Sequence, residues 1–292
     1  MTDVTMGRSA AATQRTGIAL MCLTMLIFAT QDAISTHLVG AYNVWMVTGL
    51  RFAFMAALAL AIAARGRGVR ATMRSARPVM QALRGVLLAS QICILVSSFV
   101  LLGLIETHAI FAATPLLITL LAGVLLAERI GRARWVAVGV GLVGVLVILE
   151  PGFGVFSPYA SLAILGCFVF AAYSLLTRAV ARHDAAETSF LWTAMVGFVL
   201  MVPVGAWMWE PMTAADAGWM ALLCVCSGVA HLTLIRVYVL AEASAVQPFT
   251  YLQLVFASIL AVAFLGEALE WNVIVGAALV VAAGVFAILR AR

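Results

Sequence analysis

The sequence predicts an all-α integral membrane protein with ten transmembrane helices. Of its 292 residues, 65% are hydrophobic and only 10% are charged, whereas about 25% of the residues of a soluble domain are charged. Apolar stretches of about 20 residues follow one another along the chain, and at ~1.5 Å per residue each can cross the ~30 Å hydrocarbon core of a bilayer. Inside that core only helices and closed barrels satisfy their own backbone hydrogen bonds, so we expect these stretches to be helices.

The first apolar stretch follows a polar N-terminal segment, Met1 to Arg15. It continues without a small-residue cleavage site, so we expect a membrane helix rather than a removable signal peptide. The later stretches are separated by short connections, with no linker and no low-complexity segment. The ten helices are expected at residues 16–39, 43–64, 79–104, 107–127, 132–149, 157–181, 187–209, 216–240, 244–266 and 270–289.

Positive charge occupies every second connection, and all seventeen basic residues are arginines. If the N-terminus is cytoplasmic, the arginine-rich connections all fall on that side, and the opposite connections at 40–42, 150–158, 209–216 and 266–271 contain no arginine. The positive-inside rule therefore predicts a multi-pass membrane protein with both termini in the cytoplasm. The arginines mark one side of a membrane, and we expect no nucleic-acid partner.

The two halves of the chain resemble each other, which predicts two five-helix repeats at residues 1–152 and 153–292. In the first half an apolar stretch ends in Glu128 and is followed by a tryptophan and a glycine-rich helix, and the second half repeats this order after Glu267. Because five is an odd number of crossings, we expect the second repeat to lie inverted relative to the first. Inverted repeats are typical of secondary transporters, with a substrate site near the midplane between the repeats.

The ends of these stretches read LLAER and FLGEA, each before a glycine-rich helix. This pattern, in two five-helix copies, resembles the drug/metabolite transporter superfamily with paired EamA domains. Pro115 stands where that family usually places a proline, whereas the second half has Leu254 there and Pro248 earlier. The size and the hydrophobic interior are similar to aromatic amino-acid exporters of the YddG type. The resemblance implies an inner-membrane secondary transporter that exports small metabolites, first of all amino acids and especially aromatic ones, by alternating access around a central cavity.

Asp32 and Arg51 are ionisable residues within the predicted membrane helices, where charge is costly and therefore points to function. They lie about seven and eight residues from the outer ends of adjacent helices, hence at a similar depth of roughly 10–12 Å. One interpretation is an ion pair that joins the first two helices. The other is a coupling role, in which Asp32 exchanges a proton as the pair opens.

Polar side chains recur at helical spacing on several predicted helices, and such stripes in a bilayer face either a cavity or another helix. We expect a cavity lined by the first, third, fourth, sixth, eighth and ninth helices, with apolar walls that suit an amphipathic or aromatic small molecule. The alternative is a set of hydrogen bonds between helices. The candidate substrate-binding residues are Gln31, Gln91, Tyr173, His231, Tyr238, Tyr251 and Gln253.

The fifth and tenth predicted helices are rich in glycine and have almost no polar side chains. Small residues let helices approach closely, so we expect these two helices to form a scaffold packed on the fourth and ninth helices, with a dimer contact as the alternative. The sequence leaves the oligomeric state open and is compatible with a monomer.

Motifs for other chemistry are absent from the sequence. The chain has no lysine and therefore no P-loop, and it has no His-Glu-x-x-His or Gly-x-Ser-x-Gly motif, so we expect neither nucleotide hydrolysis nor an enzyme. All five cysteines lie in apolar stretches, and we expect no metal and no cofactor. The expected partners are a small-molecule substrate and the lipid bilayer. A broad-specificity drug exporter of the same superfamily and a non-transporting membrane assembly protein are the alternatives.

Overall fold

A computed structural model of the chain describes residues 2–102, 107, 110–111, 113–128, 130–149, 159–265 and 271–290. These described residues form helices and no strand, which confirms the all-helical fold class. The helices are α1 (Thr2–Ala41), α2 (Val44–Arg65), α3 (Val69–Thr72), α4 (Pro78–Leu102), α6 (Thr114–Leu125), α7 (Arg132–Leu149), α8 (Ala160–Val180), α9 (Ala186–Trp207), α10 (Ala214–Leu240), α11 (Ala243–Thr250), α12 (Leu252–Leu265) and α13 (Trp271–Arg290).

Six of these helices, α1, α2, α4, α8, α9 and α10, are long and apolar enough to cross a membrane. The four other predicted spans overlap α6, α7, α11 together with α12, and α13. Helical structure is therefore present at each predicted position, while the number of ten crossings stays a prediction.

The predicted helix at 244–266 is interrupted in the structure, so the expectation of one continuous helix was wrong. α11 ends at Thr250 and α12 begins at Leu252. Pro248 lies inside α11. A proline has no N–H to donate to the carbonyl four residues earlier, and its ring crowds that carbonyl. The hydrogen bond from residue 248 is therefore missing from the last turn of α11, just before the break at Tyr251.

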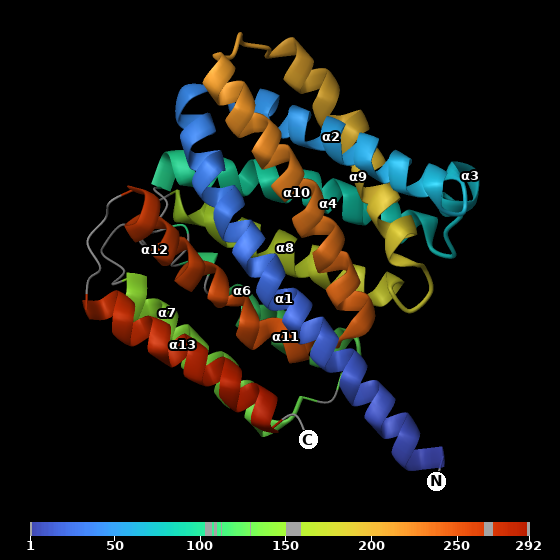
Figure 1. Ribbon diagram of the computed structural model, residues 1–292, viewed down its shortest axis with the longest axis vertical. Coiled ribbons are helices and arrows are strands. Elements are labelled where there is room, and N and C mark those ends of the chain that lie inside the picture. Colours follow the sequence, from blue (N-terminus) through green and yellow to red (C-terminus); the bar gives the residue numbers. More distant parts are fainter. Residues whose placement is uncertain are drawn as a thin grey trace.

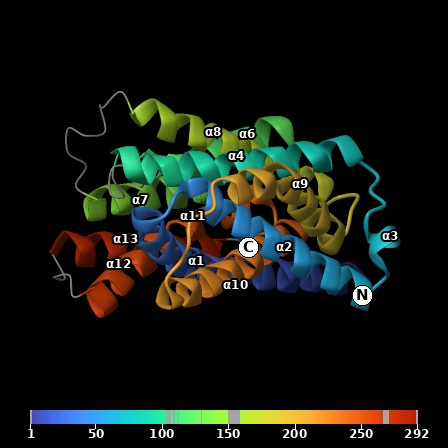
Figure 2. The ribbon, with the colours of Figure 1, turned by 90° about the horizontal axis from the view of Figure 1, so that it is seen from above.

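The helices of the two halves pack against each other in reciprocal pairs. α1 lies along α10, α4 along α8, and α2 along α9. Figure 1 shows α7 and α13 side by side on one flank of the molecule. In Figure 2, α4, α6 and α8 lie on one side and α1, α10 and α12 on the other. The centre of the fold is therefore built from both halves of the chain.

Glycine permits the close approach of α7 and α13. A Cβ atom added to Gly144 would lie 2.8 Å from the carbonyl oxygen of Gly276. Close packing of the two glycine-rich helices is as expected, but they pack mainly on each other and less on α6, α11 and α12. The expected packing on the fourth and ninth predicted helices is therefore present, through α6, α11 and α12. The contact between α7 and α13 is larger, because Gly144 and Gly276 let the two backbones come together.

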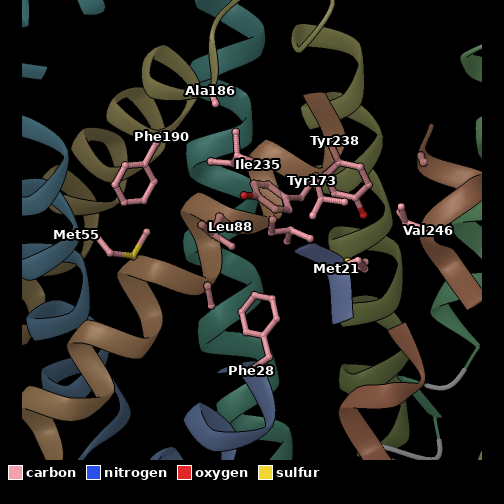
Figure 3. Close-up of a cluster of buried hydrophobic side chains, with 14 of the residues drawn as sticks. Met21, Phe28, Met55, Leu88, Tyr173, Ala186, Phe190, Ile235, Tyr238 and Val246 are labelled. Carbon is pink, nitrogen blue, oxygen red and sulfur yellow. The ribbon is translucent and has the colours of Figure 1, made fainter. Parts of the chain in front are cut away.

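The main hydrophobic core lies where α1, α2, α4, α8, α9 and α10 meet. Figure 3 shows Phe28 of α1, Leu88 of α4, Phe190 of α9 and Ile235 of α10 among its buried side chains. Phe28 and Leu88 also line the cavity described below. The same packed side chains therefore form the core and part of the cavity wall.

Candidate functional site

A cavity of about 150 Å³ lies between the two halves of the chain. Its walls come from α1, α4, α6, α8, α10, α11 and the first residues of α12, which correspond to the six helices expected from the sequence, and from Arg51 of α2 in addition. The polar residues that line it are Gln31, Asp32, Ser35, Arg51, Gln91, Thr114, His231, Gln247, Thr250, Tyr251 and Gln253. The rest of the wall is apolar and includes several phenylalanines.

The cavity brings together five of the seven residues predicted to bind substrate. Gln31 comes from α1, Gln91 from α4, His231 from α10, and Tyr251 and Gln253 from the break between α11 and α12 and the start of α12. The first two lie in the first half of the chain and the other three in the second half. The polar stripes of the sequence therefore converge on one space, with contributions from both halves.

Several of these polar groups have no hydrogen-bond partner among the described residues. Both ring nitrogens of His231 are unpartnered, as are the side-chain carbonyl oxygens of Gln31 and Gln91. The His231 ring is buried and lies edge-on to Phe28, with 5.3 Å between the ring centroids. Buried polar groups are nearly always satisfied, and each exception requires an explanation. The three residues that carry these groups all line the cavity, which makes them candidates to bind a ligand there.

Asp32 and Arg51 line the same cavity, but each is held by a neutral partner. The side-chain amide of Gln253 donates to Oδ2 of Asp32 at 2.5 Å. Nε of Arg51 donates to the hydroxyl of Ser227 at 3.0 Å. The salt bridges of the described residues do not include an Asp32–Arg51 pair. The two charges interact electrostatically at longer range, so the expected direct ion pair is not formed, while the coupling role stays a prediction.

Tyr173 and Tyr238, the other two predicted residues, do not line the cavity. Both are fully buried in the core between α8 and α10, as Figure 3 shows. The guanidinium of Arg84 lies over the Tyr173 ring, 5.4 Å from its centroid. Tyr238 follows His231 by seven residues, which places it about 10 Å farther along the helix. Helical spacing therefore identified the face of each helix that points to the interior. It did not show where along the helix the cavity ends and the closely packed core begins.

Other lining residues were not among the predicted ones. Thr114 precedes Pro115 at the start of α6, and Gln247 precedes Pro248 in α11. Thr250 also lines the cavity, close to the break after α11. A polar residue next to an intramembrane proline was the sequence signal that could have identified the first two.

Glu128 joins the two halves near the ends of α6 and α8. Its carboxylate accepts the backbone N–H of Ala243 at 3.1 Å and that of Ser244 at 3.0 Å. The Ser244 hydroxyl donates to it at 2.8 Å, and Nε of Arg178 lies 3.3 Å away. A carboxylate from the first half thus caps the N-terminus of α11, the helix that carries Gln247 to the cavity.

Asp184, in the connection between α8 and α9, makes a second link between the halves. It accepts hydrogen bonds from the Ser75 hydroxyl, from the backbone N–H of Ala76 at 2.9 Å and from the Gln81 side chain at 2.8 Å. Partial burial alone would raise the pKa of Asp184, but these hydrogen bonds together hold it below its usual range. The carboxylate is therefore ionised at neutral pH and holds the arginine-rich segment before α4.

The EamA-like transporter family matches this chain twice, over residues 15–150 and 157–290. The chain belongs to the EamA-like transporter family. The two matches confirm the paired EamA domains expected from the sequence. This membership agrees with the six helices of the described residues that are long and apolar enough to cross a membrane.

Relatives with assigned names transport metabolites. Over 150 residues the EamA chain is 31% identical to a riboflavin transporter of Vibrio cholerae, covering 50% of this chain and 49% of that protein. Over 186 residues it is 30% identical to a riboflavin transporter of Rhizobium johnstonii, with 62% and 60% covered. Over 176 residues it is 26% identical to an S-adenosylmethionine uptake transporter of Rickettsia prowazekii, with 60% of each covered. The EamA chain therefore spans about half to three fifths of the length of these relatives.

One solved crystal structure has the same fold. It superposes with a TM-score of 0.77 at 23% sequence identity and covers 95% of this EamA chain and 99% of the other. At this identity the likeness concerns the fold alone. The relatives named above are riboflavin and S-adenosylmethionine transporters, so they support metabolite transport and not amino-acid export in particular.

Proposed function

We propose that this EamA protein carries a small amphipathic organic metabolite across the inner membrane through the cavity between its halves. The observation that carries the proposal is that Gln31, Gln91 and His231, which have side-chain polar atoms without a partner among the described residues, line one cavity together with apolar and aromatic side chains. A solute with a polar head and an apolar or aromatic body complements such a wall. Buried polar groups without a partner are costly, and an assembly protein that binds no substrate would gain nothing that offsets this cost.

Alternating access between two inverted repeats is the proposed mechanism. The reciprocal helix pairs support it. If α1 corresponds to α8 and α4 to α10, a two-fold operation exchanges the α1–α10 contact with the α4–α8 contact, and both contacts are present. The same operation maps the α2–α9 and α7–α13 pairs onto themselves. Rocking one repeat against the other would expose the cavity to each side of the membrane in turn.

The substrate is proposed to be a ring-bearing metabolite or amino acid. The resemblance to amino-acid exporters favours aromatic amino acids and export, whereas the named relatives transport riboflavin and take up S-adenosylmethionine. The cavity holds Phe28, Phe111 and Phe170 beside the polar groups, which suits the flat ring of any of these solutes. Flux must therefore be measured in both directions.

We expect His231→Ala to reduce transport at least about tenfold, since the substrate loses a hydrogen-bonding group while the cavity lets water solvate what remains. The measurement is flux of labelled riboflavin, S-adenosylmethionine and tryptophan in proteoliposomes that contain only this protein. His183→Ala is the matched control, because His183 is exposed in the connection after α8. Unchanged transport per folded molecule, together with lost stability, would show that His231 has a structural role and would contradict a substrate site at this residue.

For the topology, we propose that both termini and the segment between α2 and α4 face the cytoplasm. A cysteine introduced as Arg70→Cys is then expected to resist an impermeant thiol reagent in intact cells and to react after the cells are opened. Gly40→Cys is the control on the opposite side, since a side chain at Gly40 meets no atom within 4 Å. Labelling of the residue-70 variant in intact cells would show that the orientation is reversed.

A further inference from the structure

We propose that the transported substrate is a zwitterion whose cationic group binds Asp32 and whose anionic group binds Arg51. This inference rests on the transport function proposed above and specifies its substrate class. Each of the two buried ionisable side chains would thus bind one charged group of the solute's polar head. The aromatic part of the cavity wall would then hold the body of the solute.

The two charges are the only ionisable Asp, Glu or Arg side chains among the residues that line the cavity. Both are almost completely withdrawn from solvent, with Arg51 2% and Asp32 6% exposed. Arg84, another fully buried arginine, lies outside the cavity against Tyr173. The described lining of the cavity therefore holds one acidic and one basic side chain.

In the described part of the chain neither side chain has a counter-charge in direct contact, and the two interact with each other only at longer range. Asp32 is hydrogen-bonded by the neutral amide of Gln253, and Arg51 donates to the neutral hydroxyl of Ser227. A buried charge without a counter-charge in direct contact is costly. A bound counter-charge removes that penalty, so the occupied cavity is favoured when the solute supplies both a cation and an anion.

Charge matching excludes other classes of solute by the same reasoning. A monoanion could neutralise Arg51 but would meet the uncompensated carboxylate of Asp32, and a monocation would have the opposite problem. An uncharged solute would leave both charges unpaired and would also displace the water that solvates them. A solute with both charges leaves neither side chain uncompensated.

Each of the two charged side chains that line the cavity belongs to the first half and is hydrogen-bonded by a residue of the second half. Gln253 of α12 fixes Asp32 of α1, and Ser227 of α10 fixes Arg51 of α2. Movement of one half against the other would change these bonds and with them the spacing of the two charges. Binding of the zwitterion is therefore coupled to the same movement that alternating access requires.

The test compares solutes that differ only in charge, in proteoliposomes with purified protein. The zwitterionic probes are phenylalanine and tryptophan, and S-adenosylmethionine is a further probe that carries the same zwitterionic head group together with a sulfonium cation. Phenethylamine and tryptamine lack the carboxylate, phenylpropionate and indolepropionate lack the amine, and riboflavin has no head-group charge. At least one zwitterion is expected to be transported. Its single-charge analogues are expected to inhibit the flux of that labelled zwitterion at least about tenfold more weakly than the unlabelled zwitterion does.

The variants then separate the two charges. Asp32→Asn keeps an oxygen that can accept from Gln253. This variant is expected to bind solutes with and without the amine equally well, while it still binds solutes with a carboxylate better than those without one. Arg51→Gln is expected to do the reverse, and Arg51→Lys, which keeps the charge, is expected to retain part of the carboxylate preference. The matched controls are Glu210→Gln and Arg70→Gln, both at exposed positions outside the cavity, and they are expected to change neither preference.

The outcomes distinguish this inference from the transport function itself. Transport of riboflavin without transport of any zwitterion would overturn the zwitterion assignment and leave the transporter intact. If the zwitterion and both single-charge analogues inhibited flux of the labelled zwitterion equally well, the zwitterion assignment would be overturned as well. The absence of flux for every solute in both directions, with folded protein in the vesicles, would instead contradict the transport function.

Discussion

Glu128→Ala is expected to lower the free energy of unfolding by about 3 kcal/mol, the loss typical of breaking a buried ion pair at one partner. The Glu128 side chain is 3% exposed and that of Arg178 is 17% exposed. The substitution removes the acceptor of two backbone N–H groups and one hydroxyl at the start of α11. These hydrogen bonds are buried, and buried donors left without an acceptor cost more than an ordinary hydrogen bond contributes.

The measurement is denaturation of the purified protein in detergent, with Glu187→Ala as the matched control. Glu187 pairs with Arg236 at 3.4 Å, but their side chains are 41% and 49% exposed. An exposed pair contributes only about 0–1 kcal/mol. Glu128→Gln is expected to fall between the two alanine variants, because its amide keeps one acceptor oxygen. Equal losses for the Glu128 and Glu187 variants would show that the capping contacts do not stabilise α11.

Gly205→Leu is expected to lower the free energy of unfolding by about 3 kcal/mol or more, at the top of the range for overpacking. A Cβ atom at Gly205 would lie 2.8 Å from the carbonyl oxygen of Trp45 and 3.1 Å from Cα of Gly49. These are backbone atoms of α2, which cannot rotate away as a side chain can. The substitution must therefore separate α9 from α2 along a contact that joins the two halves.

Gly218→Leu is the control for the glycine prediction. Gly218 lies in α10, and a Cβ atom there meets nothing within 4 Å. Because leucine favours the helix over glycine by up to about 1 kcal/mol, this variant is expected to be neutral or slightly more stable in the same denaturation assay. A similar loss in both leucine variants would mean that the short backbone distances at Gly205 do not limit the packing of α2 and α9.

The sequence by itself determined the fold class, the paired domains and most of the cavity. Runs of about 20 apolar residues permit few structures other than helices in a bilayer. The same constraint concentrates polar side chains on faces that avoid lipid, so Gln31, Gln91, His231 and Gln253 could be assigned to one space before any coordinates were known. These features depend on periodicity and composition, which a single helix already displays.

Only the tertiary structure decided which polar groups meet and at what depth. Tyr238 shares the helix face of His231 but lies in the closed core, and Glu128 caps a helix that starts more than 100 residues later. Asp32 and Arg51 share a cavity without forming a direct pair, since Gln253 and Ser227 of the other half bond to them instead. Periodicity determines the direction of a side chain around its own helix axis. The tilt, the separation and the axial offset of neighbouring helices depend on close contacts such as those at Gly205 and Gly144, and these appear only when both halves are packed together.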